Sequence, residues 1–310
     1  MGGGPAGTTC AWKLKQKGME CIILDKNSFP REKVCAGWIT PKVMKDLKID
    51  IEEYPHTLVT FSRFHIHIYG KNPKIKTKQY AIRRYEFDDW LLKRSHAKAY
   101  HHHAKNIARD NGTYIIDDAY RCKYLIGAGG TYCPVYRSLF ADFNPRARKS
   151  YITAIEEEFV CHYKDTNCHL WFFENGLPGY SWYVPKGHGY VNVGIGGVFE
   201  RLKRRNTNIK KQWERFKQKL EDLSLIDNHP FSPKGYNYYL RQNIQVAHRN
   251  NAYLIGDSAG LATKDLGEGI GPAVESAILA ADSICHGSHF SFKSVTTYSL
   301  PGIVLAGLDF

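Results

Sequence analysis

The chain has 310 residues, of which 43% are hydrophobic, with a net charge of +13 and a pI near 9.2. This length allows one large domain or two medium ones. No apolar run approaches the roughly 18–20 residues that cross a bilayer, and no signal peptide is recognised. The eight cysteines form no CxxC pair, which favours reduced thiols in a cytoplasm over a disulfide framework or a zinc site. The positive charge predicts an anionic partner such as a nucleotide, a pyrophosphate lipid or a membrane surface, and no nucleic-acid motif is found.

The first 25 residues have the order of a dinucleotide-binding unit. Gly2, Gly4 and Gly7 form G-x-G-x-x-G, an amphipathic helix follows, and a short buried strand ends at Asp25. The glycines allow close approach to a pyrophosphate, and an acid about 20 residues further on binds a ribose hydroxyl. A strand normally precedes this fingerprint. Either that central strand is missing, which should cost stability, or another segment fills its place.

The residues after Asp25 are predicted to form a loop over the cofactor. Pro30 and Gly37 mark the loop, and Arg31 and Lys33 either meet phosphate or ribose or are solvated charges. A short helix is expected over Thr40–Leu47, with Thr40 as its cap.

Period-two alternation predicts strands over Thr57–Tyr69 and Ile75–Ile82, in a sheet separate from the nucleotide unit. A helix is expected over Tyr85–Ile107. It would contain His101, His102 and His103, and consecutive helical side chains point about 100° apart, so we predict no metal site there.

The second half of the chain is predicted to add two kinds of structure. Strands are expected over 112–117 and 122–126, the latter leading into the glycine-rich turn 127–130 and a helix from Cys133. Strands between residues 151 and 197 should form a second, mixed sheet. An amphipathic helix over Asn208–Leu223 carries a basic outer face, which is either an ordinary solvated face or a contact for a membrane surface.

The last predicted elements deliver an acid to a helix N-terminus. A strand over Ala252–Asp257 ends in an acid, and a turn through Gly269 and Gly271 leads into a helix over Ala273–Ser283. This arrangement could bind a ribityl hydroxyl while the helix dipole faces the electron-rich edge of a flavin.

Three blocks of the sequence resemble the three FAD-contacting motifs of flavoproteins with the p-hydroxybenzoate-hydroxylase-type fold: Gly2–Gly7 with Asp25, Tyr124–Gly130, and Leu254–Pro272. Within that group, three further motifs are similar to the geranylgeranyl reductase family: Pro30-Arg31 with Cys35–Gly37, Gly129–Val135, and Tyr180-x-Trp182-x-Val184-Pro185. The resemblance covers about residues 1–285. Val184 departs from it, because the reductase motif usually has Phe there.

The resemblance implies an α/β fold with an FAD-binding Rossmann-like domain of the glutathione-reductase/p-hydroxybenzoate-hydroxylase type and a second, mixed β-sheet substrate domain. The expected FAD-binding domain is discontinuous, with segments 1–56, 83–150 and 246–290. The expected substrate domain comprises 57–82 and 151–245, and 291–310 would be a C-terminal tail.

The activity that the resemblance implies is reduction of carbon–carbon double bonds in an isoprenoid-type lipid. FAD would be bound non-covalently and reduced by an external donor such as NADPH, NADH or ferredoxin. A cytoplasmic protein with peripheral membrane contact is expected. Two alternatives stay open: a flavin-dependent monooxygenase or halogenase, whose related motif is W-x-W-x-I-P, and a truncated, non-catalytic module that binds lipids or partners.

The resemblance also implies the site residues. Those expected to contact the cofactor are Gly2, Gly4, Gly7, Asp25, Lys26, Arg31, Cys35, Ala36, Gly37, Gly127, Ala128, Gly129, Gly256, Asp257, Gly267, Gly269, Ile270 and Gly271. Those expected to line the substrate cavity are Tyr180, Trp182, Pro185, Gly196 and Gly197. Cys35 is the one candidate catalytic residue, since a thiol could donate a proton; otherwise it is a small residue that shapes its loop.

Overall fold

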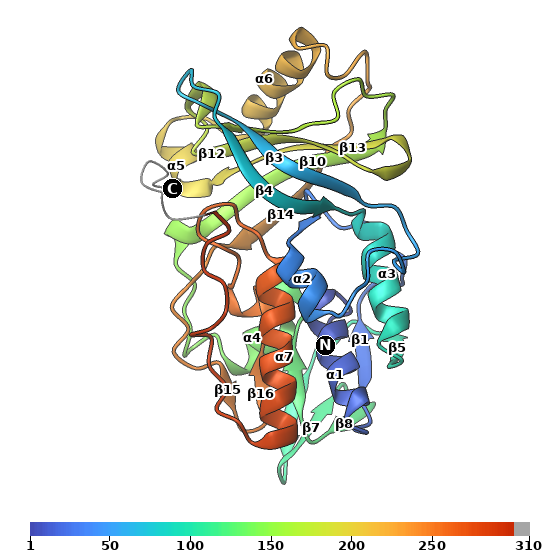
Figure 1. The fold of residues 1–310 in the computed structure, drawn as a ribbon. Coiled ribbons are helices and arrows are strands. Elements are labelled where there is room, and N and C mark those ends of the chain that lie inside the picture. The colour runs from blue at the N-terminus through green and yellow to red at the C-terminus, as the bar shows by residue number, and fades with distance from the viewer. Residues whose placement is uncertain (301–310) are drawn as a thin grey trace. The chain divides into compact units, whose positions relative to one another are not determined.

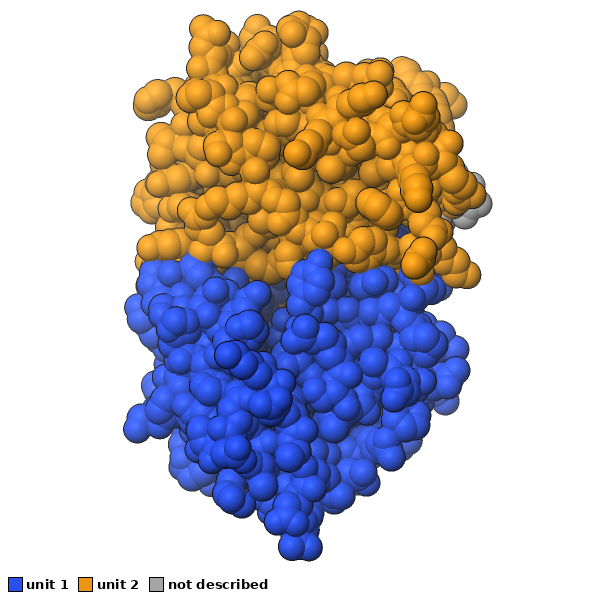
Figure 2. Space-filling view, turned by 180° about the vertical axis from the view of Figure 1, so that it is seen from behind, with its two compact units in different colours: residues 1–31, 87–147, 238–309 blue, residues 32–86, 148–237, 310 orange. Residues whose placement is uncertain are grey.

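A computed structural model describes residues 1–300, and the chain divides into two compact units (Figure 1 and Figure 2). Unit 1 contains residues 1–31, 87–147 and the described part of 238–309, and unit 2 contains residues 32–86 and 148–237. Both units are assembled from segments that lie far apart in the sequence. The domain limits given above stay a prediction.

Unit 1 combines small sheets with helices. Its strands are β1 (Ile22–Asp25), β5 (Lys98–His101), β6 (Ile107–Asp110), β7 (Thr113–Ile116), β8 (Tyr120–Cys122), β9 (Leu125–Gly127), β15 (His248–Arg249) and β16 (Ala252–Leu254). Its helices are α1 (Pro5–Gln16), α4 (Pro134–Leu139), α7 (Ile270–His286) and most of α3 (Arg84–Arg94). Strand β1 pairs in parallel with β5, and β9 pairs in parallel with β16.

The first two residues connect β1 and β9. The Gly2 amide donates to the Leu24 carbonyl of β1 at 2.8 Å. On the other side, the Met1 amino group donates to the Ile126 carbonyl of β9 at 2.6 Å, and the Ala128 amide donates to the Met1 carbonyl at 2.8 Å. Met1 and Gly2 therefore lie between the two strands, where the carboxyl end of the expected central strand would be.

Helices α1 and α7 pack against each other through small side chains. Their shared core includes Ala6 and Cys10 of α1 and Ala273, Ala277 and Ala280 of α7, all buried. Small residues allow two helix backbones to approach closely. This packing brings two segments that are more than 250 positions apart into one part of unit 1.

Unit 2 is built on an eight-stranded mixed sheet with the order β14-β10-β13-β12-β11-β3-β4-β2. The strands are β2 (Trp38–Ile39), β3 (Val59–Ile68), β4 (Lys74–Ala81), β10 (Tyr151–Val160), β11 (Cys168–Phe172), β12 (Gly179–Pro185), β13 (Tyr190–Val198) and β14 (Lys234–Tyr239). Strands β11 and β3 pair in parallel, whereas β10, β13, β12 and β11 pair antiparallel in turn. The predicted mixed sheet is confirmed.

One face of this sheet is covered by α6 (Ile209–Asp222), as Figure 1 shows. Trp213, Phe216 and Leu220 of α6 pack in one core with Tyr183 and Val193 of the sheet. Unit 2 also holds α2 (Pro41–Asp46), capped by Thr40 as predicted, and α5 (Phe199–Arg204).

The predicted helix over Tyr85–Ile107 is wrong in its second half. Helix α3 ends at Arg94, and the chain then forms β5. His96 lies in the left-handed region at φ 54°, and Lys98–His101 pairs with β1. Sheet pairing thus overrides the local helical pattern, so the three histidines follow or end a strand. Among residues 1–300, no group of three or more His, Cys, Asp or Glu side chains is arranged to hold a metal ion.

The eight cysteines are free thiols, as their spacing predicted. Within residues 1–300, no helix combines the length and the apolar character that crossing a bilayer requires.

Candidate cofactor and substrate sites

The first glycine block forms a tight corner at the start of α1, and Gly7 lies in the first turn of that helix. Gly2 has φ +104°, and a Cβ on Gly7 would lie 1.8 Å from the Gly2 carbonyl oxygen. Neither position accepts a side chain without moving the backbone. Helix α1 begins at this corner with no acidic residue in its first turn. Its N-terminal N–H groups and positive dipole end are therefore available for an anion.

The second block lies beside the first. A Cβ on Gly2 would come within 2.3 Å of the Ala128 carbonyl oxygen, and one on Gly7 within 3.4 Å of the Ala128 side chain. Gly127 is closed in by Leu254 and Val135, each 2.9 Å from its ideal Cβ position. The turn at the end of β9 thus packs directly on the corner at the start of α1.

The third block also reaches this place. Gly256 has φ +59°, and its ideal Cβ position is 3.2 Å from the Ala6 Cβ of α1. The Gly256 amide donates to the Ser276 hydroxyl of α7 at 3.0 Å. A Cβ on Gly269 would lie 3.0 Å from an Asp257 carboxylate oxygen, so this acid sits beside the start of α7. The three glycine-bearing corners therefore converge within unit 1.

Asp25 is fixed at the end of β1 by backbone donors. One carboxylate oxygen accepts from the Gly3 amide at 2.7 Å, and the other accepts from the Asn27 amide at 2.8 Å. Each oxygen keeps acceptor capacity for a further donor. The neighbouring Lys26 is exposed, and its carbonyl bonds to a ring nitrogen of His101 at 2.8 Å.

Arg31 lies next to the first turn of α1. Its Nη2 is 3.5 Å from the ideal Cβ position of Gly4 and 3.3 Å from a carboxylate oxygen of Asp88, which is fully buried. The guanidinium also lies over the Phe29 ring, 4.8 Å from its centroid. Arg31 therefore places a guanidinium near the glycine corner, and its charge is paired with Asp88.

These features fit a dinucleotide such as FAD. The corners have no room for side chains, and two helices of 12 and 17 residues begin there without acids in their first turns. Asp25 ends β1, and Asp257 lies in a 3-10 turn shortly after β16. A model of the NAD(P)-binding Rossmann-like domain matches residues 1–67.

Comparison with known proteins identifies the family. An uncharacterized protein of Methanosarcina barkeri is 31% identical over 298 residues, which cover 92% of this chain and 73% of the relative. A crystal structure of a geranylgeranyl bacteriochlorophyll reductase-like protein from Thermoplasma acidophilum superimposes with a TM-score of 0.78 at 19% identity, covering 92% of this chain and 77% of that one.

The chain belongs to the geranylgeranyl reductase family of FAD-dependent oxidoreductases. The menaquinone reductase of Mycobacterium tuberculosis is 24% identical, covering 91% of this chain and 74% of the relative. The geranylgeranyl diphosphate reductase of Rhodobacter capsulatus is also 24% identical, and the match covers 87% of this chain and 70% of that relative. The fold is shared more widely: the flavin-dependent halogenase CmlS has a TM-score of 0.71 at 18% identity, covering 92% of this chain and 58% of that one.

The geranylgeranyl reductase motif Tyr180-x-Trp182 lies on β12 of unit 2. Strand pairing places Tyr180 opposite Gly196 and Trp182 opposite Gly194 on β13, so all four are on one face of the sheet. Gly197 and Pro185 belong to the other face by the same alternation. Of the five residues predicted to line a cavity, the structure therefore brings three together on one face.

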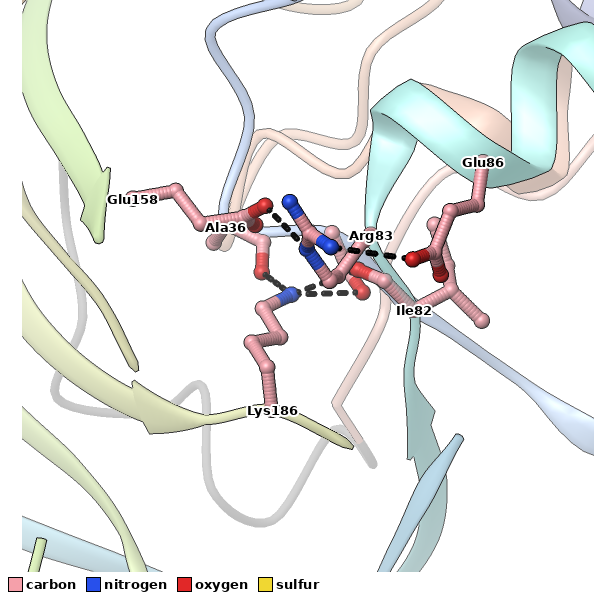
Figure 3. Close-up of polar contacts among 7 residues, drawn as sticks. Ala36, Ile82, Arg83, Glu86, Glu158 and Lys186 are labelled. Carbon is pink, nitrogen blue, oxygen red and sulfur yellow. Dashed lines mark hydrogen bonds and ion pairs between the residues drawn. The ribbon is translucent and has the colours of Figure 1, made fainter. Parts of the chain in front are cut away.

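The Cys35–Gly37 part of the family motif is held by Lys186, which sequence reasoning missed (Figure 3). Lys186 is fully buried just after β12. Its Nζ donates to the carbonyls of Ala36, Gly37 (3.1 Å) and Ile82 (2.7 Å). Burial lowers the pKa of this ammonium. No sequence signal identifies such a lysine, because its partners are backbone carbonyls from distant segments.

Arg83 forms the second polar group in Figure 3. Its guanidinium pairs with Glu158 of β10 and with Glu86 of α3, each at 2.9 Å. The cation also lies over the Tyr190 ring at 3.5 Å. These contacts tie the end of β4 to the end of β10.

Arg146 is a second missed residue, in unit 1. It donates to the Thr131 carbonyl, after the second glycine block, and to the Ser258 carbonyl of the third block at 3.2 Å. Its guanidinium also lies 3.8 Å from the centroid of the Tyr136 ring. Arg146 thus holds two of the three blocks together.

Proposed function

We propose that this chain reduces carbon–carbon double bonds of an isoprenoid-type lipid, with FAD as a non-covalent cofactor. The observation that carries the proposal is the convergence of three glycine-bearing corners in unit 1. The Tyr-x-Trp motif in unit 2 supports the reductase activity, and so do relatives named as menaquinone reductase and geranylgeranyl diphosphate reductase.

The cofactor contacts that we propose follow from the geometry of unit 1. Gly2, Gly4 and Gly7 with the N-terminus of α1 would hold the pyrophosphate, and Asp25 would accept from a ribose hydroxyl. Asp257 would accept a hydrogen bond from a ribityl hydroxyl, and residues 267–271 would pass along the isoalloxazine ring of the flavin. FAD, when bound, supplies the hydride-carrying chemistry.

On the substrate side, unit 2 contributes an aromatic face. Trp182 is 5% exposed, and its ring centroid lies 5.7 Å from that of Tyr180. Opposite Tyr180, Gly196 adds no side-chain bulk, and its ideal Cβ position has no neighbour closer than 3.5 Å, which suits an apolar chain that must lie flat. Enclosure of this kind would orient the double bond and exclude water.

An absorption spectrum of the purified protein tests flavin binding. We expect bound FAD, bleached by dithionite and by one donor among NADPH, NADH and ferredoxin. Replacing Asp25 with Ala should weaken FAD binding about tenfold or more, since the ribose contact is lost. Asp110→Ala, at an exposed position in β6, is the matched control and should retain FAD fully. Turnover of a geranylgeranyl lipid to a product heavier by two hydrogens per double bond tests the reaction.

A flavin-dependent monooxygenase or halogenase is the second candidate, because the halogenase CmlS shares the fold. Reduced enzyme would be mixed with oxygen, halide and an aromatic acceptor. An oxygenated or halogenated product would favour this activity. Reduction of the lipid under anaerobic conditions would favour the reductase.

A non-catalytic module that binds lipids or partners is the candidate from another class. It predicts a colourless protein that takes up no FAD on reconstitution. Stoichiometric FAD binding would eliminate it.

We also propose contact between α5–α6 and an anionic membrane surface, where an isoprenoid lipid would be found. The exposed cations of this surface are Lys203, Arg204, Arg205, Lys210, Lys211 and Arg215. Phe199 is 47% exposed beside them. Cosedimentation with phosphatidylglycerol vesicles but not phosphatidylcholine vesicles is expected, and it should weaken at high salt. Equal behaviour with both vesicles would contradict this contact.

A further inference from the structure

Glu156 of β10 lies in one row with the Tyr-x-Trp motif. It pairs with Gly194 of β13, which in turn pairs with Trp182 of β12, so the three residues share one face of the sheet. A Cβ on Gly194 would lie 2.2 Å from the Trp182 ring and 2.7 Å from the Glu156 Cβ. The absence of a side chain at Gly194 therefore brings the indole and the glutamate together.

The carboxyl group of Glu156 is buried and only half satisfied. The residue is 5% exposed, and its Oε1 accepts from the Cys35 amide. Its Oε2 is buried and has no hydrogen-bond partner within residues 1–300. A buried polar atom without a partner is costly, so it points to a missing polar or reacting group.

A second orphaned atom lies on the same face. Asn192 pairs with Glu158 and Val184 in the strand register, and it is 1% exposed. Its Oδ1 accepts from the Trp182 indole N–H at 2.7 Å, and its Nδ2 has no partner within the described chain. The amide lies close enough to Glu156 to lower the pKa of that carboxyl. Glu156 and Asn192, the residues that carry the two atoms, thus both adjoin Trp182.

The cations around Glu156 are engaged with other groups. Lys186, after β12, donates to three backbone carbonyls, and Lys33, in the Cys35 loop, lies over the Tyr236 ring at 3.0 Å. On β10 itself, Glu158 is paired with Arg83. Burial is the largest influence on the pKa of Glu156 and raises it to about 7. The Cys35 amide, Asn192, Lys186 and Lys33 each lower this pKa, but by less than burial raises it. A substantial fraction is therefore the neutral acid near pH 7.

We propose that Glu156 is the proton donor of the double-bond reduction; this inference rests on the function proposed above. One alkene carbon takes the hydride supplied by reduced flavin. The other takes the proton from Oε2, so the O–H bond breaks and a C–H bond forms. Glu156 is left as a carboxylate, which takes a proton from solvent before the next turnover. Cys35 is then a positioning residue that acts through its backbone N–H.

Infrared spectroscopy tests the acid without any turnover. Glu156→Gln keeps an oxygen for the Cys35 amide and removes the titrating proton. We expect wild-type protein to show protonated-carboxyl absorption with a midpoint near pH 7, of which Glu156→Gln removes one component. The component that stays belongs to Glu268, because burial raises its pKa to about 7 as well. Glu157→Gln is the matched control, because Glu157 lies on the other face and bonds to His229 at 2.8 Å. A spectrum unchanged by Glu156→Gln would overturn the proposal.

Single-turnover lipid reduction with chemically reduced FAD tests the proton transfer. We expect Glu156→Gln to slow this step about 10²–10⁴-fold, the usual contribution of a general acid, with FAD binding unchanged. The wild-type rate should fall about tenfold per pH unit above pH 7, and the variant should lack this decline. A variant within threefold of wild type would refute the role of Glu156.

Two further measurements keep the outcomes distinct. If Glu156→Gln fails to fold, Glu156→Asp replaces it, because aspartate keeps an acid on a shorter side chain. This variant should reduce the lipid at a rate between those of wild type and an inactive protein, with the same decline of the rate at high pH. A rate equal to that of wild type would count against the proposal. If wild-type protein binds no FAD or reduces no lipid, the proposed function fails and the proton-donor role falls with it. The infrared titration still reports the state of Glu156 in that case.

Discussion

The Nζ of Lys186 occupies the space that a side chain on Gly37 would need. An ideal Cβ on Gly37 would come within 2.6 Å of this nitrogen and 2.5 Å of the Ile82 carbonyl oxygen, and Gly37 has φ +67°. The glycine and the buried lysine therefore depend on each other. Both lie in unit 2, 149 positions apart.

We predict that Gly37→Ala destabilises the protein by about 2–4 kcal/mol, combining a left-handed backbone with a steric clash. Gly70→Ala is the control, since Gly70 has φ +74° but no atom within 4 Å of its ideal Cβ. It should lose only about 1 kcal/mol, the cost of the backbone conformation alone. Urea unfolding measures both. If both variants lost the same free energy of unfolding, the clash at position 37 would be relieved by a small shift of its neighbours.

Lys186→Met should destabilise the protein by about 2–4 kcal/mol, because three buried carbonyls lose a donor that methionine cannot replace. The same substitution at Lys203, which is exposed on α5, should leave the unfolding midpoint unchanged. Thermal unfolding followed by circular dichroism provides the comparison. A stable Lys186→Met protein would mean that water reaches these carbonyls.

Glu156 should make stability depend on pH. Its pKa is raised from 4.5 to about 7 in the folded protein, so unfolding releases a proton between these values. Rising pH therefore favours unfolding across this window, by up to about 3 kcal/mol at about 1.4 kcal/mol per pKa unit. Wild type minus Glu156→Gln, measured by urea unfolding from pH 4 to 8, should show this decline. A flat difference would place the carboxyl in a solvated environment.

A histidine pair on the β3–β11 part of the sheet should have the opposite dependence. His169 bonds to a ring nitrogen of His67 at 2.9 Å and to Asp165 at 3.0 Å. Burial lowers the pKa of His169 below 6.5, despite the raising influence of Asp165. The unfolded chain then binds more protons, so stability should fall as pH drops below 6.5.

The variant His169→Gln should remove part of this acid sensitivity, measured as the unfolding midpoint between pH 7 and pH 5. His289→Gln, at an exposed position in unit 1, is the control and should behave as wild type. If His169→Gln loses as much stability at pH 5 as wild type does, other groups cause the acid sensitivity.

The periodic and glycine-rich parts of the sequence predicted the structure well. The helix over Asn208–Leu223 forms close to the expected limits, because its side-chain pattern and the Asn208 cap agree with its packing. The helix expected after Gly7 also forms, but it already begins at Pro5. The helix expected to reach Ile107 failed where pairing of β5 with β1 outweighed local propensity. Of the candidate site, the glycines were identifiable because only residues without a Cβ fit those corners.

The sequence by itself therefore determined the family, the blocks that form the candidate cofactor site and the second sheet, since these depend on spacing and residue type. Only the tertiary structure decided which residues support them. Lys186 and Glu156 act through partners more than 100 positions away, and Arg146 reaches Ser258 across 112 positions. These bonds go to backbone atoms. Backbone partners leave no trace in a residue pattern, because every residue carries the same carbonyl and nearly all carry the same amide.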